Sequence, residues 1–325
     1  MTTARTVPVT TEMDGDELDV EDAWHLARRH GLGTVLVGAF VRFRYGDGFT
    51  NSRALALQAC LAILPFLLAV MGLAADIDGD RPSRVVAITV NAVSPASGGD
   101  DALVEALAGG SEEAGEIALI FGLFFAALSM TTAMAQVERG SNRIYGIRRD
   151  RPALQKYGRA AVFTAVLAVP VGLGFLVLVA GGAFGDAMVA EYGWSEGVHR
   201  AWQWGRWPVG LLILVFTIAV LFDHAPRRRQ PALSWLALGS GVTVVLSMAA
   251  AAGLAAYTNI SGSFSSSYGP LAGIVALLLW SLLSSISLFY GIAVCAQLEA
   301  LRAGQTEPAY DDPGRPHEEQ VSDAP

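Results

Sequence analysis

Charged side chains are scarce in this chain. Asp, Glu, Lys and Arg make up 16% of its 325 residues, whereas soluble domains carry about 25%. The long apolar blocks contain almost no ionisable residue near their centres, and such residues usually mark ion and proton paths inside membranes. This scarcity indicates lipid as the main solvent and argues against a proton-driven or ion-driven pump.

Residues that hold metals, disulfides or cofactors are also few. The two cysteines, Cys60 and Cys295, lie inside apolar blocks, where a thiol behaves as a small hydrophobic group. The five histidines have no metal-site spacing, and no Walker sequence, nucleophile elbow or dinucleotide fingerprint is present in a suitable context. We therefore expect no catalytic residue, metal or cofactor and no enzyme activity. The net charge of −8 argues against a nucleic-acid partner.

Long apolar blocks fill most of the chain. A helix of about 20 apolar residues crosses a hydrocarbon core of about 30 Å. The sequence therefore predicts an all-α, polytopic membrane protein whose single transmembrane domain covers residues 53–302. Its six spans are expected at about 54–75, 116–135, 160–184, 207–222, 233–258 and 270–298, the fourth being the shortest.

Basic residues alternate between the loops. They are numerous before the first span, between the second and third, and after the fourth, where Arg227, Arg228 and Arg229 follow one another. The opposite loops hold few, and the loop between the fifth and sixth spans holds none. Because Lys and Arg stay on the cytoplasmic side, this pattern predicts both termini inside a bacterial cytoplasmic membrane, with the chain crossing it several times.

The segments outside the spans have distinct compositions. Residues 1–22 and 303–325 are acidic and polar, which predicts disordered tails. Residues 23–52 mix arginines with Leu, Val and Phe, which predicts a basic amphipathic segment at the cytoplasmic interface. Tyr192 and the tryptophans up to Trp207 predict a loop along the outer membrane surface.

Some polar and small residues enter the spans. Small residues spaced by four, Gly181 with Gly185 and Ala249 with Gly253, predict close approaches of helix backbones. Hydroxyls and amides allow two interpretations, namely hydrogen bonds between helices or the lining of a hydrophilic groove. The candidate groove-lining residues are Gln58, Ser281, Ser284, Ser285 and Tyr290.

Short motifs connect the blocks to a known family. The chain resembles the YihY/BrkB family of bacterial inner-membrane proteins, once labelled ribonuclease BN-like, over about residues 42–301. It departs from the family pattern at Ala293 and Cys295, which replace a common Glu and Asn. The residues that carry the resemblance are Arg53, Pro65, Asn142, Tyr145, Gly146, Pro226, Tyr268, Gly269, Trp280 and Gly291.

The resemblance implies six spans with both termini inside, and it leaves two functional hypotheses open. The first is a transporter or flippase for a lipid or another amphiphilic envelope component, with membrane lipids as partners. The alternative is a non-transporting scaffold that recruits envelope-assembly proteins through its tails and basic loops. A second copy of the chain is a further candidate partner. The ribonuclease label is rejected, because a metal-dependent RNA hydrolase needs a His/Asp cluster that this sequence lacks.

Overall fold

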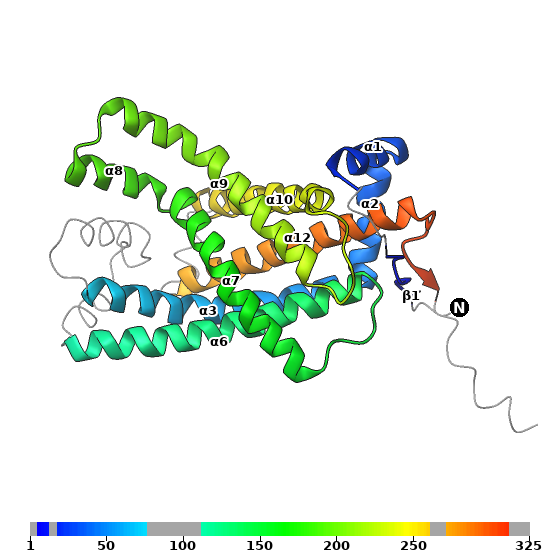
Figure 1. The fold of residues 1–325 in the computed structure, drawn as a ribbon, viewed down its shortest axis with the longest axis horizontal. Coiled ribbons are helices and arrows are strands. Elements are labelled where there is room, and N and C mark those ends of the chain that lie inside the picture. The colour runs from blue at the N-terminus through cyan, green and yellow to red at the C-terminus, as the bar shows by residue number, and fades with distance from the viewer. Residues whose placement is uncertain (1–4, 13–17, 77–111, 261–270, 312–325) are drawn as a thin grey trace, which may run out of the picture.

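A computed structural model describes residues 5–12, 18–76, 112–260 and 271–311 (Figure 1). The long helices pack as a bundle, with α3 against α6, α10 against α12 and α7 against α9. Figure 1 shows α1, α2 and β1 at one end of this bundle and α8 at the other. The described elements are β1 (Arg5–Thr6), α1 (Val20–His30), α2 (Leu32–Tyr45), α3 (Gly48–Asp76), α6 (Glu112–Ile144), α7 (Ala153–Leu178), α8 (Gly181–Tyr192), α9 (Glu196–His224), α10 (Leu233–Ile260), α12 (Ala272–Arg302) and β2 (Tyr310–Asp311).

Several helices are long and apolar enough to cross a membrane. Among the described residues there are five, at Leu119–Ile144, Ala153–Gly174, Glu196–His224, Leu233–Thr258 and Ala272–Arg302. The first predicted span lies within α3, which is 29 residues long and does not belong to those five. The all-α, multi-pass membrane fold is thus confirmed. The count of six spans and the placement of both termini inside the cell stay predictions.

The third and fourth predicted spans have other boundaries in the structure. The third was expected to reach residue 184, but α7 ends at Leu178 and α8 begins at Gly181. The fourth was expected from residue 207, but α9 begins eleven residues earlier, at Glu196. Gly193, whose φ of 66° ends α8, and Ser195, whose side chain caps α9, fix the turn between these helices.

The tryptophan-rich segment, predicted as a surface loop, is largely helical and packs α9 against α8. The indole Nε1 of Trp202 donates a hydrogen bond of 2.6 Å to the carbonyl of Gly181. A Cβ at Gly185 would lie 2.8 Å from Cδ1 of the same indole, so the small residue makes room for a tryptophan side chain and not, as was predicted, for a helix backbone. Gly253 differs, because no atom of the described residues lies within 4 Å of its Cβ position.

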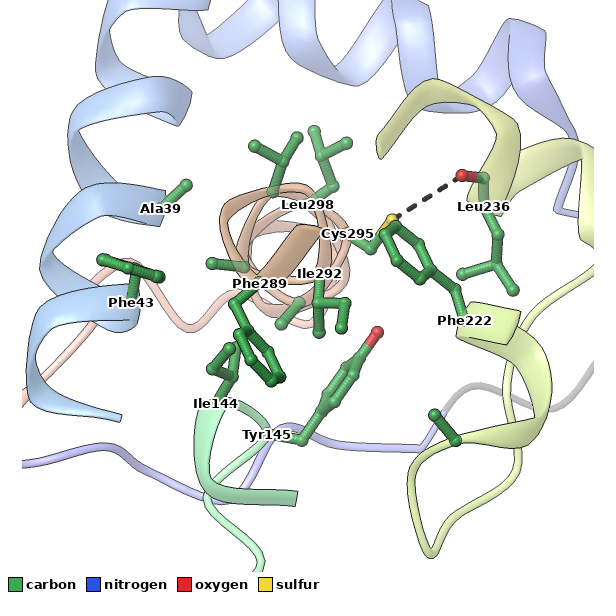
Figure 2. Close-up of a cluster of buried hydrophobic side chains, with 14 of the residues drawn as sticks. Ala39, Phe43, Ile144, Tyr145, Phe222, Leu236, Phe289, Ile292, Cys295 and Leu298 are labelled. Atoms are coloured by element: carbon green, nitrogen blue, oxygen red, sulfur yellow. Dashed lines mark hydrogen bonds between the residues drawn. The ribbon is translucent and has the colours of Figure 1, made fainter. Parts of the chain in front are cut away.

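The core lies around the last turns of α12. Every side chain from Gly291 to Leu301 is buried. Figure 2 looks along this helix and shows side chains of α2, α10 and the end of α6 directed toward it, including Phe43, Leu236 and Ile144. α12 is therefore the central element at this end of the bundle.

The tails differ from the prediction of disorder over the described parts. Residues 5–12, which we call the strap, lie against the bundle, and β1 forms a short antiparallel ladder with β2 in which Arg5 pairs with Asp311. Thr10 is 2% exposed. Residues 1–4, 13–17 and 312–325 of the predicted tails lie outside the described residues. The strap is ordered because its backbone and hydroxyl groups find hydrogen-bond partners in the bundle.

The predicted amphipathic segment forms α1, α2 and the start of α3. Asp19 caps α1 by accepting hydrogen bonds from the amides of Glu21 and Asp22. Both α1 and α2 expose apolar side chains, among them Trp24, at 40%, and Val37, at 65%. Such surfaces suit contact with lipid.

Candidate functional site

An apolar groove lies between α2, α10 and α12. Its volume is about 520 Å³, within the range of about 300–1,000 Å³ that holds small molecules. The groove is open along its side, and Ser287 and Tyr290 are the only polar residues among the described residues that line it. The lining residues are Leu36, Val37, Phe40, Leu246, Ala250, Leu283, Ile286, Ser287 and Tyr290. This surface favours a hydrocarbon chain over a polar solute, because burying a polar group without a hydrogen bond is costly.

Tyr290 holds α2 to α12 beside the groove. Its hydroxyl donates a hydrogen bond of 3.0 Å to the backbone carbonyl of Leu36. Its ring meets that of Phe43 edge to face, with the ring centroids 6.3 Å apart. The polar end of Tyr290 is therefore engaged by the protein itself.

The structure separates the five candidate groove-lining residues. Tyr290 lines the groove, whereas Ser281 and Ser285 are buried, and Gln58 and Ser284 are half-buried away from it. Residues 283, 286, 287 and 290 form one stripe of α12 at helical spacing, and residues 281 and 285 lie on another face. Among the described residues, Oγ of Ser281 and Oε1 of Gln58 have no hydrogen-bond partner.

A polar cluster lies at the end of the bundle that carries the strap. We define it as Arg42, Tyr145, Arg228, Gln297 and Glu299. Nη2 of Arg228 donates a hydrogen bond of 2.7 Å to Oε2 of Glu299, and these side chains are 2% and 0% exposed. The Arg228 guanidinium also stacks 4.5 Å from the ring centre of Tyr145. A buried ion pair of this kind is costly to break, because the remaining charge has no water around it.

Tyr145 and Arg42 complete the polar cluster. The hydroxyl of Tyr145 donates to Oε1 of Glu299 at 3.1 Å, and burial together with the Glu299 charge raises the pKa of Tyr145 well above its usual value. Figure 2 shows Tyr145 rising toward α12 between apolar side chains. Arg42 is fully buried and donates through Nε to Oε1 of Gln297 at 3.1 Å. Burial lowers the pKa of Arg42 to about 10, so its guanidinium is still charged at neutral pH.

The strap covers the polar cluster. Nη1 of Arg42 donates to Oγ1 of Thr10 at 2.8 Å, and Nη2 of Arg228 donates to the carbonyl of Thr11 at 3.2 Å. The amide of Thr10 donates to the carbonyl of Tyr145 at 3.1 Å. Gly146 has a φ of 79°, and a Cβ there would collide with the carbonyl of Pro8. Only glycine therefore permits this approach of the strap.

The loop after α6 is organised by Asp150. Its carboxylate accepts hydrogen bonds from Asn142, Lys156 and Arg139 at 3.1, 3.1 and 3.2 Å. Partial burial raises the pKa of Asp150, but these three hydrogen bonds outweigh it and lower the pKa below its usual value. Oδ1 of Asn142 also accepts the backbone amide of Arg227 at 2.7 Å, so this loop is joined to the loop after α9.

Replacing Asp150 by Asn should lower the thermal midpoint of the purified protein at pH 7, because hydrogen bonds to a charged acceptor are lost. The pKa of Asp150 lies below the value of about 3.9 in an unfolded chain. Its stabilisation is therefore present above about pH 4 and is lost as the pH falls through the folded pKa. The difference from wild type should shrink below that pH. Glu307→Gln, at an exposed position, is the control and should match wild type at every pH.

Four residues that carry the family resemblance gather at this end of the bundle. Asn142, Tyr145 and Gly146 form the described contacts with the two loops and the strap. The carbonyl of Pro226 accepts a hydrogen bond of 3.2 Å from Arg151. These residues join the loops after α6 and α9 to α12.

The other residues of the resemblance are dispersed. Pro65 and Gly291 lie at close helix contacts: a Cβ at Gly122 would be 2.7 Å from the carbonyl of Pro65, and one at Gly291 would be 2.6 Å from that of Gly239. Arg53 and Trp280 are exposed, and Tyr268 and Gly269 lie outside the described residues.

Sequence reasoning missed Arg42, Gln297 and Glu299. Arg42 was assigned to the membrane interface, and no role was given to Gln297 or Glu299. The available signal was the pair of polar residues, two positions apart, at the end of an otherwise apolar run. Only the fold shows that this run ends inside the protein and not in water.

A second pocket lies near the other end of the bundle, between the end of α7 and the first half of α9. It has a volume of about 330 Å³ and is walled by Trp194 and Trp202, with Arg206 at its edge. Phe184 of α8 packs against both indoles. Within the described parts of the chain, no group of three or more His, Cys, Asp or Glu residues could hold a metal ion.

Comparison with known proteins relates this chain to a family. The model of the family described as virulence factor BrkB matches residues 39–314. Among curated proteins, the chain is 23% identical over 272 residues to the ribonuclease-like protein YfkH of Bacillus subtilis (strain 168), covering 83% of this chain and 97% of that protein. No solved structure matches the chain.

Other relatives are longer than this chain. A UPF0761 membrane protein of Chromohalobacter salexigens is 24% identical over 274 residues, which are 81% of this chain and 63% of that protein. The UPF0761 membrane protein PSPA7_4558 of Pseudomonas paraeruginosa is 27% identical over 184 residues, which are 56% of this chain and 42% of that protein. The chain thus spans less than two thirds of these two proteins.

Proposed function

We propose that this chain, which belongs to the family described as virulence factor BrkB, moves a lipid or another amphiphilic envelope component across the bacterial cytoplasmic membrane. The observation that carries the proposal is the groove between α2, α10 and α12, which is open and almost wholly apolar. An acyl chain could enter this groove without leaving a buried polar group unpaired, because the groove is almost wholly apolar. The apolar span centres favour a passive process over an ion-driven one.

Filling the groove tests this proposal. Ala250 of α10 lines the groove, so Ala250→Trp should obstruct it and reduce the movement of a fluorescent phospholipid between leaflets of reconstituted liposomes by about tenfold or more, since an acyl chain no longer fits. Ala252→Trp is the matched control, because Ala252 is exposed on the same helix and does not line the groove. Equal rates in the two variants, at equal reconstitution, would remove the groove from the mechanism.

Native mass spectrometry gives an independent readout. Gently purified wild type should retain a lipid that an unrelated six-span protein from the same membrane does not, and Ala250→Trp should lose it. Bulk phospholipid alone in all samples would contradict the transport proposal.

A scaffold is the alternative, and one observation favours it. Arg148, Arg149 and Arg227 are exposed at the strap end of the bundle, where they could bind an acidic partner. Removal of residues 312–325 should cripple a scaffold that recruits through its acidic tail but spare a transporter. The name of the Bacillus subtilis relative describes that protein, and no ribonuclease activity is proposed for this chain.

A further inference from the structure

The polar cluster holds more positive than negative charge. The side chains of Arg42 and Arg228 are both buried, and Glu299 is the one carboxylate that they share among the described residues. Two cations and one anion leave an excess of one positive charge. Burial of an uncompensated charge is costly, so such an excess calls for an anion.

Two guanidinium nitrogens in the polar cluster also lack an acceptor. Nη2 of Arg42 and Nη1 of Arg228 are buried and make no hydrogen bond with any described residue. Arg42 is 0% exposed, and the side chain of Arg228 is 2% exposed. A buried donor without an acceptor loses the hydrogen bonds that it made with water. These donors therefore favour a ligand that offers more oxygen atoms than the strap does.

Both arginines donate hydrogen bonds to neutral oxygens of the strap. Thr10 offers a hydroxyl to Arg42 and Thr11 a backbone carbonyl to Arg228, so two consecutive residues bridge the two cations. A neutral oxygen is a weaker acceptor for guanidinium than a charged one. The strap thus stands where an anion with several oxygens would bind.

We propose that Arg42 and Arg228 form a binding site for a phosphate group, and that the strap occludes this site until the ligand displaces it. A phosphodiester carries a single negative charge, which would balance the excess charge of the polar cluster. Its oxygens would accept from both guanidinium groups, whose planar geometry suits phosphate. The inference rests on the proposed function, because it names a phosphate-bearing headgroup as the substrate class.

The apolar groove and the polar cluster share α2. Leu36, Val37 and Phe40 line the groove, and Arg42 lies on the same helix and reaches the polar cluster. Gly38 allows Gln297 to pack directly on α2, since a Cβ at that position would lie 2.9 Å from Nε2 of Gln297. Displacement of the strap would therefore act on a helix that forms one wall of the groove.

Hydrogen exchange of the full chain in maltoside detergent tests the strap directly. One arm adds inorganic phosphate, and a second adds a short-chain phosphatidylglycerol below its micellar concentration. We expect faster exchange over residues 5–12, because the amide of Thr10 loses the carbonyl of Tyr145. The arm that accelerates exchange at lower concentration identifies free phosphate or the lipid headgroup as the ligand. Unchanged exchange in both arms overturns the proposal.

A matched pair of strap variants measures the competition. Thr10→Val removes the hydroxyl that Arg42 binds, and it should increase the affinity for the active probe about tenfold, measured by the probe concentration at half-maximal exchange. Val9→Ala changes an exposed side chain of the strap and should leave the affinity unchanged. Equal affinities for the two variants would show that the strap and the ligand do not compete for Arg42.

The arginine itself is tested by Arg42→Gln, which should abolish the response of residues 5–12 to either probe. If this variant does not fold, Arg42→Lys replaces it, since Lys keeps the charge but offers no fork and should weaken binding about tenfold. Binding that is independent of Arg42 overturns the site. Because all these measurements are made in detergent without transport, a protein that binds phosphate but moves no lipid would refute the proposed function alone.

Discussion

Arg228→Met is expected to reduce the free energy of unfolding by about 3–5 kcal/mol, because it leaves a buried carboxylate without its cation. Glu299 is fully buried and would retain Tyr145 as its hydrogen-bond donor, which cannot compensate a full negative charge. The substitution also removes the stacking of guanidinium on the Tyr145 ring. The thermal midpoint of the detergent-solubilised protein should fall sharply, and the loss should appear in the yield of monodisperse protein.

Removal of both charged partners separates the contribution of the ion pair to stability from that of side-chain packing. The double variant Arg228→Met with Glu299→Leu should recover most of the lost stability, since apolar groups often replace a buried ion pair at little cost. Arg149→Met removes a charge from an exposed position in the loop after α6 and should change stability by about 0.5 kcal/mol or less. A double variant as unstable as Arg228→Met would contradict this account.

Gly291→Ala is expected to be strongly destabilising at the contact between α10 and α12. The added Cβ would collide with Oγ1 of Thr243 and would lie 2.6 Å from the carbonyl oxygen of Gly239. A backbone atom cannot rotate away as a side chain can, so the helices must move apart. The expected cost is at the upper end of the range of about 1–3 kcal/mol for overpacking, measured by thermal unfolding.

Gly253→Ala on α10 provides the control, because no described residue outside the local helix backbone lies within 4 Å of the added methyl group. Alanine should raise the stability by about 0.5–1 kcal/mol there, since glycine loses more chain entropy in a helix. Opposite signs for the two substitutions are therefore expected. A loss of stability in both variants would indicate a cost of alanine that is unrelated to packing.

Hydropathy predicted the positions of the apolar helices better than their ends. The block at 233–258 agrees with α10 to within two residues, because lipid-facing helices are apolar throughout. The failure between residues 179 and 206 has a local cause. Trp202 and Arg206 lower the hydropathy of the first half of α9, yet this half is helical because Ser195 caps it and Trp202 packs on Gly181 and Gly185.

The candidate site could be predicted only in part. The family resemblance selected Asn142, Tyr145 and Gly146, and the structure brings them together with Pro226. Arg42 and Glu299 are 257 positions apart in the sequence, so no local pattern could place them in one cluster. The serines of α12 were grouped by their proximity in the sequence, whereas the helix separates them onto different faces.

The ladder between β1 and β2 also has a consequence for the order of synthesis. Asp311 is made long after Arg5, so their pairing must wait until all the helices between them have emerged from the ribosome. Gln297 and Glu299 are made with α12, so Arg42 is synthesised 255 residues before its hydrogen-bond partner Gln297. Until α12 packs, Arg42 and Arg228 can remain hydrated. They are therefore dehydrated only when Glu299 is present to pair with Arg228.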